Sequence, residues 1–495
     1  MKAIQFFIAS ILMVNTLQAQ SENIFWNRDF WATHPTIEVI EQKISEGHSA
    51  TALNPYGFDA VVYAILSKTP NKVVKHLLSK KGNDSNKLTH DKRTYVFWAA
   101  YKDNVDLMKH LIAKNAKMDL KDSHHFSVLT FAAATGVTNR AVYDLCIQNG
   151  IDIKTDKDEH GANALLLIAP FLEDESLINY FTSKGLSIHD KDNEGNGIFN
   201  YAARKGNKNF LNILIKNGVD YKALNNTGGN AFIFASQGTR STSNTLKTYK
   251  YLEKIGLEPN ITTDDGFTPL HALAYKNTDL EIFDYFLSKE VDVNQPDING
   301  DTPFINAASG NSLERIEYLA HHVKNFNVQN KKGISPLMKA VESNNSKVVA
   351  FLLKKGANPL ATDAQGNALV YYLLESYNSK DINDFDEKFR LLQNNNVDFK
   401  GLQANGNTLW HLAVKQNNVD LLEQIAKLKT LVNKKNNEGY TPLHLAAMKA
   451  KNATILEYLI SVGADKTVKT DFDESVYDLA NENEQLEETN INFLK

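Results

Sequence analysis

Apolar residues recur along the chain as pairs of short stripes with helical spacing. In residues 439–465, Leu443, Ala446 and Ala447 lie on one face of a short predicted helix. After a polar turn, residues 455–460 supply the apolar stripe of a second predicted helix. The alanines keep the first helix thin, so neighbouring units of the same kind can approach closely. The pattern predicts an all-α chain built from helix–turn–helix units.

Glycine marks the two turns of each unit. The turn before the first helix holds Gly57, Gly161, Gly195, Gly228, Gly266, Gly300, Gly333, Gly366, Gly406 and Gly439, with Lys92 and His125 in the same slot. The turn after the second helix holds Gly47, Gly82, Gly150, Gly185, Gly218, Gly256, Gly356 and Gly463. Both turns need a positive φ, which glycine adopts without strain. These two positions account for 18 of the 25 glycines, and the first series is spaced by 33 to 40 residues, which indicates an internal repeat.

A Thr-Pro-Leu-His motif follows the first glycine. It is literal at Thr268–His271 and Thr441–His444, with degenerate copies that begin at Thr302, Ser335 and Thr408. The threonine can cap the first helix, and proline is tolerated in the first helical turn. This motif on a period near 33 residues resembles the ankyrin repeat. The resemblance covers residues 57–472 as about twelve repeats and implies an ankyrin-repeat solenoid of stacked helix pairs.

Both ends of the stack need caps, because a terminal repeat leaves its apolar face uncovered. Residues 20–56 are expected to form the N-terminal capping partial repeat, with an aromatic segment at 24–31 and a helix at 35–44. Residues 473–495 are expected to form a C-terminal capping half-repeat and an acidic tail, in which residues 482–488 keep the last face solvated.

Two spacings, of 38 and 40 residues, exceed the period. They predict polar insertions between the two helices of their repeats, near Gly238–Asn244 and Ser376–Asp386. These insertions are either surface loops or local contact points for a partner, and the sequence leaves both open.

Composition narrows the function classes. The chain is 42% hydrophobic and 23% charged, as folded proteins are, and its net charge of −4 argues against nucleic acid as the main partner. The single cysteine excludes an intrachain disulfide and a cysteine-based metal site. The sequence has no nucleophile elbow, phosphate loop, zinc-protease helix or dinucleotide fingerprint, so we expect neither an enzyme nor a cofactor.

The N-terminus predicts export. Lys2 precedes an apolar run at residues 3–17, and Ala19 offers a small residue for cleavage, so residues 1–19 are interpreted as a signal peptide. The run is shorter than the ~20 residues that span a bilayer, and no later segment is apolar enough to do so. We therefore expect a monomer without a membrane span, in the periplasm or outside the cell.

Three histidines, His271, His411 and His444, occupy one slot of the motif. Each stands in a different repeat, so they are not expected to converge on a metal or a catalytic centre. The resemblance to ankyrin repeats implies instead that each ring hydrogen-bonds the backbone and orders its hairpin. Cys146 has apolar neighbours on a second helix and is expected to be a buried hydrophobic residue rather than a reactive thiol.

Two acidic segments, Asp156–Gly161 and Asp190–Gly195, imitate the start of an EF-hand loop. That loop needs a bidentate carboxylate at its twelfth position, where this chain has Leu167 and Tyr201. We therefore expect both segments to be hairpin tips, with no metal bound.

One column admits two interpretations. The residue after the histidine slot is Tyr63, Trp98, Phe131, Leu167, Tyr201 and Phe234 in the first six repeats, and Ala272, Asn306, Lys339, Tyr372, Leu412 and Leu445 in the others. These side chains either form a ladder that packs between repeats or leave an aromatic stripe open on the concave face of the N-terminal half. Aromatic side chains in an open stripe would be favoured anchors for a partner.

The resemblance to ankyrin repeats implies a non-enzymatic scaffold that binds an unidentified protein on a concave wall of hairpin tips and first helices. The predicted partner-binding residues mix charge and apolar groups, as interfaces do: Asp265, Phe267, Tyr275, Lys276, Asp301, Ile334, Glu342, Tyr440, Met448 and Lys449. The alternatives are a periplasmic stress-protection accessory to a catalase-type enzyme, or a secreted effector that acts on host proteins.

Overall fold

The structure is a computed structural model that describes residues 23–276, 279–428 and 430–495. The predicted signal peptide, residues 1–19, lies outside the described residues. Regular structure in the described residues is helical, and the only strand-like pairings there are two isolated bridges, Lys191 with Gly197 and Gln403 with Asn407. The prediction of an all-α chain is confirmed.

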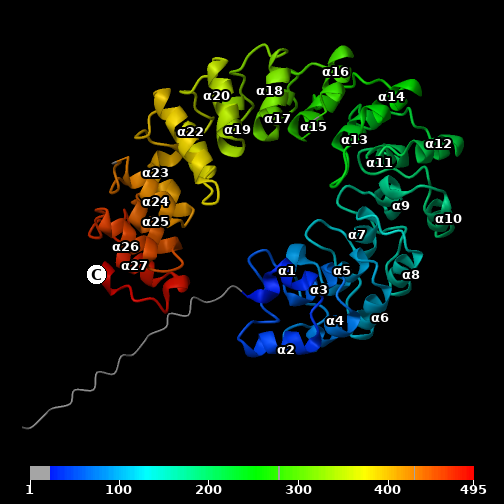
Figure 1. Cartoon of the computed structure of the whole chain (residues 1–495), viewed down its shortest axis with the longest axis horizontal. Helices are drawn as coiled ribbons and strands as arrows, with labels where there is room; N and C mark the ends of the chain where they lie inside the picture. The colour runs from blue at the N-terminus through cyan, green and yellow to red at the C-terminus, as the bar shows by residue number, and fades with distance from the viewer. Residues whose placement is uncertain (1–22, 277–278, 429) are drawn as a thin grey trace, which may run out of the picture. The chain divides into compact units, whose positions relative to one another are not determined.

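The described chain divides into two compact units. Residues 23–202 and 209–220 belong to unit 1, and residues 203–208 and 221–495 belong to unit 2. In each unit, helix pairs stack side by side; the first helix of each pair lies on the inner side of a curved row and the second on the outer side (Figure 1). Twelve such pairs, α3 to α26, occupy the described residues.

The helices are short, as the apolar stripes predict. Up to the fifth pair they are α1 (Arg28–Ala32), α2 (Ile37–Ser45), α3 (Ala60–Leu66), α4 (Asn71–Leu78), α5 (Tyr95–Tyr101), α6 (Val105–Ala113), α7 (Val128–Ala134), α8 (Arg140–Gln148), α9 (Ala164–Ile168), α10 (Ser176–Ser183), α11 (Ile198–Ala203) and α12 (Lys208–Lys216). The first helices continue as α13 (Ala231–Gln237), α15 (Pro269–Lys276), α17 (Pro303–Gly310), α19 (Pro336–Ser343), α21 (Leu369–Glu375), α23 (Leu409–Lys415), α25 (Pro442–Lys449) and α27 (Val476–Asn481). The second helices continue as α14 (Leu246–Lys254), α16 (Leu280–Ser288), α18 (Leu313–Ala320), α20 (Ser346–Lys354), α22 (Ile382–Asn394), α24 (Val419–Ala426) and α26 (Thr454–Ser461). Six 3-10 turns complete the described residues: η1 (Ile24–Trp26), η2 (His90–Lys92), η3 (Ala169–Phe171), η4 (Ala404–Gly406), η5 (Glu484–Leu486) and η6 (Asn492–Leu494).

Side-chain caps start the first helices. Thr441 accepts a hydrogen bond from the backbone N–H of His444, and Pro442 occupies the first turn of α25. Helices α17 and α19 begin in the same way. Where the threonine is missing, a short polar residue takes its place: Asp59 caps α3 and Asn163 caps α9. Each substitute still satisfies an N–H group that has no partner inside the helix.

The apolar stripes form the contacts between repeats. In α25, Leu443, Ala446 and Ala447 are at most 1% exposed, and in α26, Leu456 and Leu459 are fully buried. First helices contact first helices of the neighbouring repeats, as α15 contacts α17 and α17 contacts α19. Because a helix pair is too small to enclose a core, these residues are buried only by the adjacent repeat.

Asparagine amides join adjacent repeats beyond their second helices. The side chain of Asn86 donates to the carbonyl of Asn115 at 2.9 Å and accepts from the N–H of Lys117 at 2.7 Å. Asn327 and Asn433 make the same two bonds to the repeats that follow them. Each amide pairs with the backbone as a peptide group would, so polar groups at the junction stay satisfied.

A second set of amides caps the ends of first helices. Asn344 donates to the carbonyl of Ala308 in the preceding repeat at 3.0 Å, and Asn483 donates to the carbonyl of Ala447 at 3.0 Å. The last carbonyls of a helix have no partner within it, so a side chain from the next repeat fills this role. Stacking therefore completes the hydrogen bonding of each repeat as well as its core.

Both ends of the stack are covered. At the N-terminus, Phe25 and Trp31 are fully buried, and the indole Nε1 of Trp31 donates to the carbonyl of Phe25 at 2.8 Å. After α27, Leu486 and Leu494 in two 3-10 turns are 2% exposed. The acidic stretch at 482–488 therefore also contributes an apolar side chain to the cap.

The two insertions differ. Residues 238–245 form a loop between α13 and α14, as predicted. In the second insertion the prediction of a polar loop is wrong beyond Asp381, because α22 begins at Ile382 and is lengthened to 13 residues. Phe385, within the predicted loop, is 4% exposed and packs edge-on against Tyr377 with ring centroids 5.2 Å apart. The buried face of the lengthened helix consists of Phe385, Lys388 and Leu392.

The turn positions have a positive φ whether or not they hold glycine. Lys92 and His125, which occupy the first turn slot, both have φ of 60°. Gly333 has an added constraint, because a Cβ there would collide with the backbone nitrogen of Ala364 in the next hairpin. At Gly356, in the second turn slot, a Cβ would meet nothing within 4 Å. The first turn at Gly333 therefore requires glycine for close approach as well as for its conformation.

We expect Leu443→Ala to destabilise the C-terminal repeats by roughly 2–5 kcal/mol, because it leaves a cavity between repeats. The effect should stay local, since only neighbouring repeats touch. Hydrogen exchange followed by mass spectrometry should show faster exchange mainly in residues 406–495. Equal loss of protection along the whole chain would contradict nearest-neighbour stacking.

The two kinds of turn glycine should respond differently to alanine. Gly356→Ala introduces only an unfavourable φ and should cost roughly 1–2 kcal/mol. Gly333→Ala also forces the hairpins apart and should cost about 1–3 kcal/mol more. The free energy of local opening, measured by hydrogen exchange at the Ala364 amide for the first turn and in α20 for the second, gives each cost. Equal costs at the two sites would mean that close approach of the hairpins contributes nothing.

Candidate binding surface

One short polar side chain holds most of the hairpins. The Oδ1 atom of Asp297 accepts hydrogen bonds from the N–H groups of Asn299 at 2.8 Å and Asp301 at 2.9 Å. Asn436 makes the same pair of bonds in the last full repeat. Because this side chain fixes the backbone of the tip, the residues beside it are free to vary without loss of the turn.

Backbone hydrogen bonds connect neighbouring hairpins. In unit 2, the N–H of Lys331 donates to the carbonyl of Asn299 at 2.8 Å, and the N–H of Ala364 donates to the carbonyl of Lys332 at 2.9 Å. Unit 1 has bonds of the same kind. The tips therefore form a continuous ridge within each unit, beside the first helices. We call the tips and first helices together the inner surface.

The motif histidines join each repeat to the next. The Nδ1 atom of His411 accepts from the N–H of Thr408 at 3.0 Å, and its Nε2 atom lies 3.0 Å from the carbonyl oxygen of Tyr440 in the following hairpin. His271 and His444 make equivalent bonds. The prediction that these rings order the hairpins is confirmed, and they do not converge on a common site.

Burial keeps these rings neutral. Desolvation disfavours the imidazolium form and lowers the pKa of His411 to about 4, and it also lowers the pKa of His271 and of His444. The hydrogen bond from Nε2 to a carbonyl opposes this shift only in part. Protonation would in addition place an N–H on Nδ1, against the N–H of the threonine that it now accepts.

The aromatic column belongs to the fold. Its members are at most 7% exposed at Tyr63, Trp98, Phe131, Tyr201, Phe234 and Tyr372. Their polar atoms bond the hairpin of the same repeat: the indole Nε1 of Trp98 donates to Thr89 at 2.8 Å, and the hydroxyl of Tyr372 donates to Asp363 at 2.8 Å. The interpretation as a packing ladder is confirmed, and the interpretation as an open stripe is wrong.

The acidic segments and the cysteine are structural. Asp158 and Asp192 each accept two backbone hydrogen bonds within their own hairpins. Among the described residues, no group of three or more His, Cys, Asp or Glu side chains is placed to hold a metal ion. Cys146 is fully buried, as predicted, and its burial raises the pKa of the thiol.

The predicted partner-binding residues fall into two groups on unit 2. Three consecutive repeats carry Asp265, Phe267, Tyr275, Asp301, Ile334 and Glu342. The repeat of α25 carries Tyr440, Met448 and Lys449. The repeats of α21 and α23 lie between the two groups, so the structure does not bring all of these residues together. The side chain of Lys276 lies outside the described part of the chain.

Two of the predicted aromatic residues also serve the hairpin. Phe267 is half-buried and stacks on His271 with ring centroids 5.1 Å apart. Tyr440 is half-buried with its ring edge-on to His444 at 6.4 Å. Aromatic side chains directly after the turn glycine therefore pack against the motif histidine of the same repeat. This contact was not predicted from the sequence.

The remaining predicted residues differ in exposure. The Oδ1 atom of Asp301 accepts from the amide of Asn330 in the next hairpin at 2.8 Å, so this carboxylate is committed to the fold. Glu342 forms an ion pair with Lys339 at 3.1 Å, and Ile334 and Met448 are half-buried. Asp265 and Lys449 are exposed, and Tyr275 at the end of α15 is 43% exposed. Tyr275 is the most accessible aromatic side chain of the predicted set.

The sequence analysis missed accessible aromatic residues on the inner surface of unit 1. Phe58 and Phe126 are half-buried beside their turns, and Tyr101 at the end of α5 is 37% exposed. His90 stacks on Phe58 with centroids 4.5 Å apart, and Phe131 contacts Tyr101 and Phe126 at 5.9 and 6.4 Å. The signal was available, because Phe58 and Phe126 fill the same slot after the turn residue that supplied four of the predicted residues, Phe267, Asp301, Ile334 and Tyr440.

A buried arginine supports this aromatic set. The guanidinium of Arg93 lies 4.3 Å from the centroid of Phe131 and 5.5 Å from that of Trp98. It forms ion pairs with Asp122 at 2.7 Å and Asp91 at 3.0 Å. The cation on the ring faces and the two carboxylates hold the aromatic residues in fixed positions.

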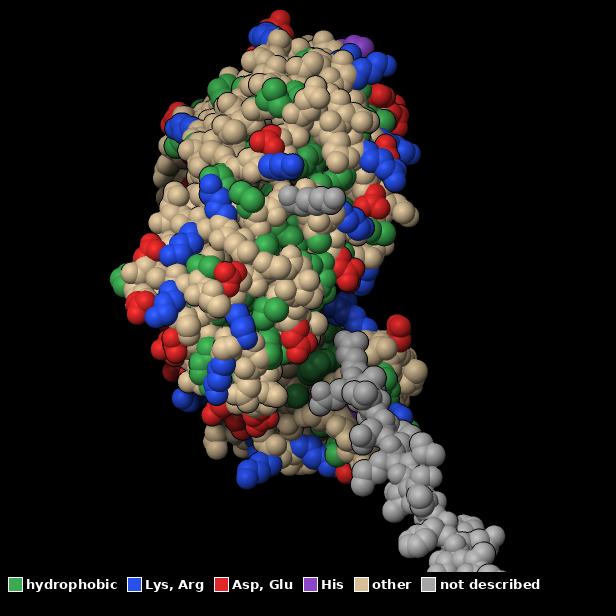
Figure 2. Space-filling view, turned by 90° about the vertical axis from the view of Figure 1, so that its left-hand side faces the viewer, with side chains coloured by type: hydrophobic (Ala, Val, Ile, Leu, Met, Phe, Trp, Pro, Cys, Tyr) green, Lys and Arg blue, Asp and Glu red, His purple; other side chains and the backbone are tan. Residues whose placement is uncertain are grey.

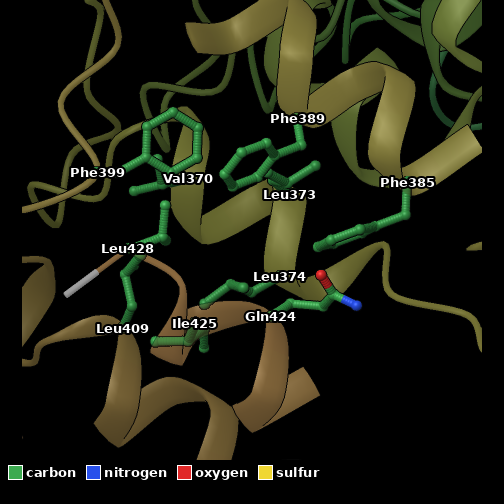
Figure 3. Close-up of a pocket in the computed structure, with 10 residues that line it drawn as sticks. All are labelled: Val370, Leu373, Leu374, Phe385, Phe389, Phe399, Leu409, Gln424, Ile425 and Leu428. Atoms are coloured by element: carbon green, nitrogen blue, oxygen red, sulfur yellow. The ribbon is translucent and has the colours of Figure 1, made fainter. Parts of the chain in front are cut away.

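A small cavity of about 10 Å³ lies among α21, α22, α23 and α24 (Figure 3). Phe385, Phe389 and Phe399 point into it together with leucine, isoleucine and valine side chains, and Gln424 is the one polar residue in its lining. Such a volume holds about one water molecule, which needs two or more polar partners. The cavity is therefore a packing gap beside the lengthened α22 rather than a ligand site.

Comparison with known proteins identifies the repeats. The family model for ankyrin repeats, in three copies, matches residues 61–157, 240–329, 270–363, 306–386 and 364–470, which together are more than half of the chain. The crystal structure of the human ASB11 ankyrin repeat domain is 23% identical with a TM-score of 0.36, and the match covers 43% of this chain and 92% of that domain.

Relatives of known sequence match parts of the chain. The ankyrin repeat protein FPV031 of fowlpox virus is 28% identical over 169 residues, 32% of this chain and 48% of the viral protein. The ankyrin repeat protein OPG189 of variola virus is 24% identical over 247 residues, 46% and 43% of the two chains. The palmitoyltransferase AKR1 of Lachancea kluyveri is 33% identical over 119 residues, 24% of this chain and 16% of that protein. The chain thus spans less than half the length of these relatives. In the part of the chain that is described, every helix is too short or too polar to cross a membrane.

The buried histidines should make the protein sensitive to acid. Because the pKa of His411 falls from 6.5 when unfolded to about 4 when folded, its neutral form stabilises the fold fully above pH 6.5. As the pH drops through this window, the unfolded chain gains a proton and the free energy of unfolding falls, by roughly 3 kcal/mol in total for this residue.

Urea unfolding at pH 7 and pH 5 tests this dependence. His411→Gln keeps an acceptor and a donor but does not titrate, so its midpoint should fall less between the two pH values than that of the wild type. His189→Gln, at an exposed histidine, is the matched control and should behave as the wild type. An unchanged acid dependence in His411→Gln would rule out this histidine as its source.

Proposed function

Because the chain belongs to the ankyrin-repeat family, and its repeats form a protein–protein interaction domain, we propose that it is a non-enzymatic scaffold that binds a protein partner on the inner surface. Tips and first helices also build the junctions, so within them only side chains that are not covered by the neighbouring repeat are available for contact. The hairpin backbone is held by its own polar side chain, so side chains beside the tip are available for contact.

One observation carries the choice of surface. In the aromatic column after the histidine slot, the aromatic side chains are at most 7% exposed, yet Tyr101 and Tyr275 at the ends of first helices are 37% and 43% exposed. An exposed aromatic ring contributes little to folding, whereas it is a favoured anchor in an interface. Each unit therefore offers contact residues on its own inner surface: Tyr101 with Phe58 and Phe126 in unit 1, and Tyr275 with Ile334 in unit 2.

Location is a further part of the proposal. The charged start, the short apolar run and Ala19 support export to the periplasm or beyond. Fractionation of cells that express the tagged full chain tests it, and a protein that stays in the cytoplasm with its first 19 residues intact would contradict it.

The inner surface can be tested with paired serine variants. Tyr101→Ser with Tyr275→Ser removes the exposed aromatic ring at the end of a first helix in each unit and should weaken binding to the partner by roughly 2 kcal/mol or more, about thirtyfold or above. The partner is first captured with the full chain and identified by mass spectrometry, and its affinity is then measured by calorimetry.

Leu360→Ser with Leu431→Ser is the matched control. These leucines are 62% and 69% exposed but lie in connections that follow second helices. The control should bind as the wild type, and both double variants should keep their helical content, because exposed substitutions change stability by only about 0.5 kcal/mol each. If the tyrosine variant binds the partner as tightly as the wild type, the inner surface is not the binding site.

A further inference from the structure

The outer helices α4 and α6 of unit 1, with their turns, carry a surface that is rich in positive charge. Residues 68–117 contain 12 lysine or arginine residues against 4 aspartates and no glutamate, a net charge of +8 in a chain whose total is −4. Seven lysines of this segment are exposed: Lys68, Lys72, Lys75, Lys81, Lys109, Lys114 and Lys117. We call these seven residues the lysine surface.

The apolar stripe of α4 turns its lysines outward. Val73, Val74 and Leu77 are buried against the first helices, so Lys72 and Lys75 lie on the opposite, outer side. In α6 the buried residues are Leu107, Met108 and Leu111, and Lys109 is exposed between them. The other lysines of the surface stand in the turns at the ends of these two helices.

Hydrogen bonds hold the two helices side by side. At their N-terminal ends, the amides of Asn71 and Asn104 bond each other reciprocally at 3.1 and 2.7 Å. At their C-terminal ends, the hydroxyl of Ser85 donates to the carbonyl of Lys114 at 2.7 Å, and Asn86 bonds the same turn. The lysine surface therefore rests on a rigid pair of helices.

The ion pairs of unit 1 leave the lysine surface out, although Glu38 of α2 interacts electrostatically with Lys72. Nearby ion pairs use other residues, since Glu41 of α2 pairs with Lys80 and His76 and Asp59 pairs with Lys87. None of the seven lysines forms an ion pair with a described residue. Asp106 is the single carboxylate on α4 and α6. Like charges at this density repel one another, so the fold gains nothing from them.

The lysines act on each other electrostatically. Burial, followed by the charges of Lys75 and Lys114, lowers the pKa of His110. Burial and the charge of Lys68 likewise lower the pKa of Lys102. Elsewhere the signs alternate: Figure 2 shows Lys and Arg interspersed with Asp and Glu over the side of the molecule where the C-terminal helix pairs lie.

We propose that the lysine surface docks unit 1 on an anionic lipid bilayer. Helices α4 and α6 contain lysine but no arginine, tryptophan, tyrosine or phenylalanine. Protein interfaces are enriched in arginine and aromatic residues and depleted of lysine, so this composition argues against a protein partner here. Lysine ammonium groups stay hydrated and attract charge without fixed geometry, which suits a headgroup layer, and clusters of four to eight are typical of such contacts.

The extent of the surface fits a flat partner. The second helices lie on the outer side of the row, so a plane can touch only neighbouring second helices (Figure 1). On one side, α2 carries Glu38 and Glu41 with Lys43; on the other, α8 carries Arg140 with Asp144 and α10 has no charged residue, so the excess of positive charge is confined to α4 and α6 and their turns. The inner surface remains free, and this inference does not depend on the proposed protein partner.

Vesicle cosedimentation with the full chain tests the proposal. Vesicles of two parts phosphatidylcholine to one part phosphatidylglycerol should pellet the protein at low salt, whereas pure phosphatidylcholine vesicles should not, and added salt should release it. A variant with Lys72→Glu, Lys75→Glu, Lys109→Glu and Lys114→Glu should lower the partition coefficient on the order of a hundredfold.

The matched control places the same charge change in unit 2. Lys331→Glu, Lys332→Glu, Lys347→Glu and Lys354→Glu alter four exposed lysines and should leave vesicle binding within about twofold of the wild type. Circular dichroism confirms that both variants keep their helices. The proposal is overturned if the wild type does not pellet with anionic vesicles, or if both variants lose binding equally. Binding of soluble polyglutamate without vesicle binding would assign the surface to an acidic protein instead.

Discussion

A single helix pair cannot cover its own apolar face, and the rest of the structure depends on this constraint. Leu443 and Ala446 are buried only because the next repeat lies against them. The same junction must satisfy backbone groups that would otherwise be left without partners, which the side chains of Asn86, Asn344 and His411 do. Apolar burial and polar satisfaction are therefore met together, one junction at a time.

The contacts between repeats also distinguish the positions whose side chains the fold needs from the positions whose side chains it does not need. Residues that bond across to the next repeat serve the fold, such as His411 and Asp301, each of which bonds the next hairpin. Residues at the ends of first helices and on the outer sides of second helices are not needed there. These two surfaces carry accessible aromatic rings in one case and unpaired lysines in the other, so the fold leaves room for two different contacts on one stack.

Much of the inner surface could be located from the sequence, but the exposure of its individual side chains could not be predicted. The slot beside each turn glycine was identifiable from spacing, yet Phe267 and Tyr440 proved to shield a histidine, while Tyr101 and Phe126 in unit 1 were passed over. Exposure depends on what the neighbouring repeat places against a ring. That neighbour lies about 33 residues away along the chain, beyond the reach of local pattern.

The sequence by itself determined the helix pairs, their register and their turn conformations, because these follow from periodicity and from glycine and capping residues within one repeat. Lys92 and His125 adopt the positive φ that the register assigns to them even without glycine. Only the tertiary structure decided which aromatic side chains are buried, that α22 begins at Ile382 with Phe385 buried, and that α4 and α6, with their exposed lysines, are joined side by side. Each of these depends on contacts between repeats, and such contacts are set by three-dimensional packing rather than by the local order of residues.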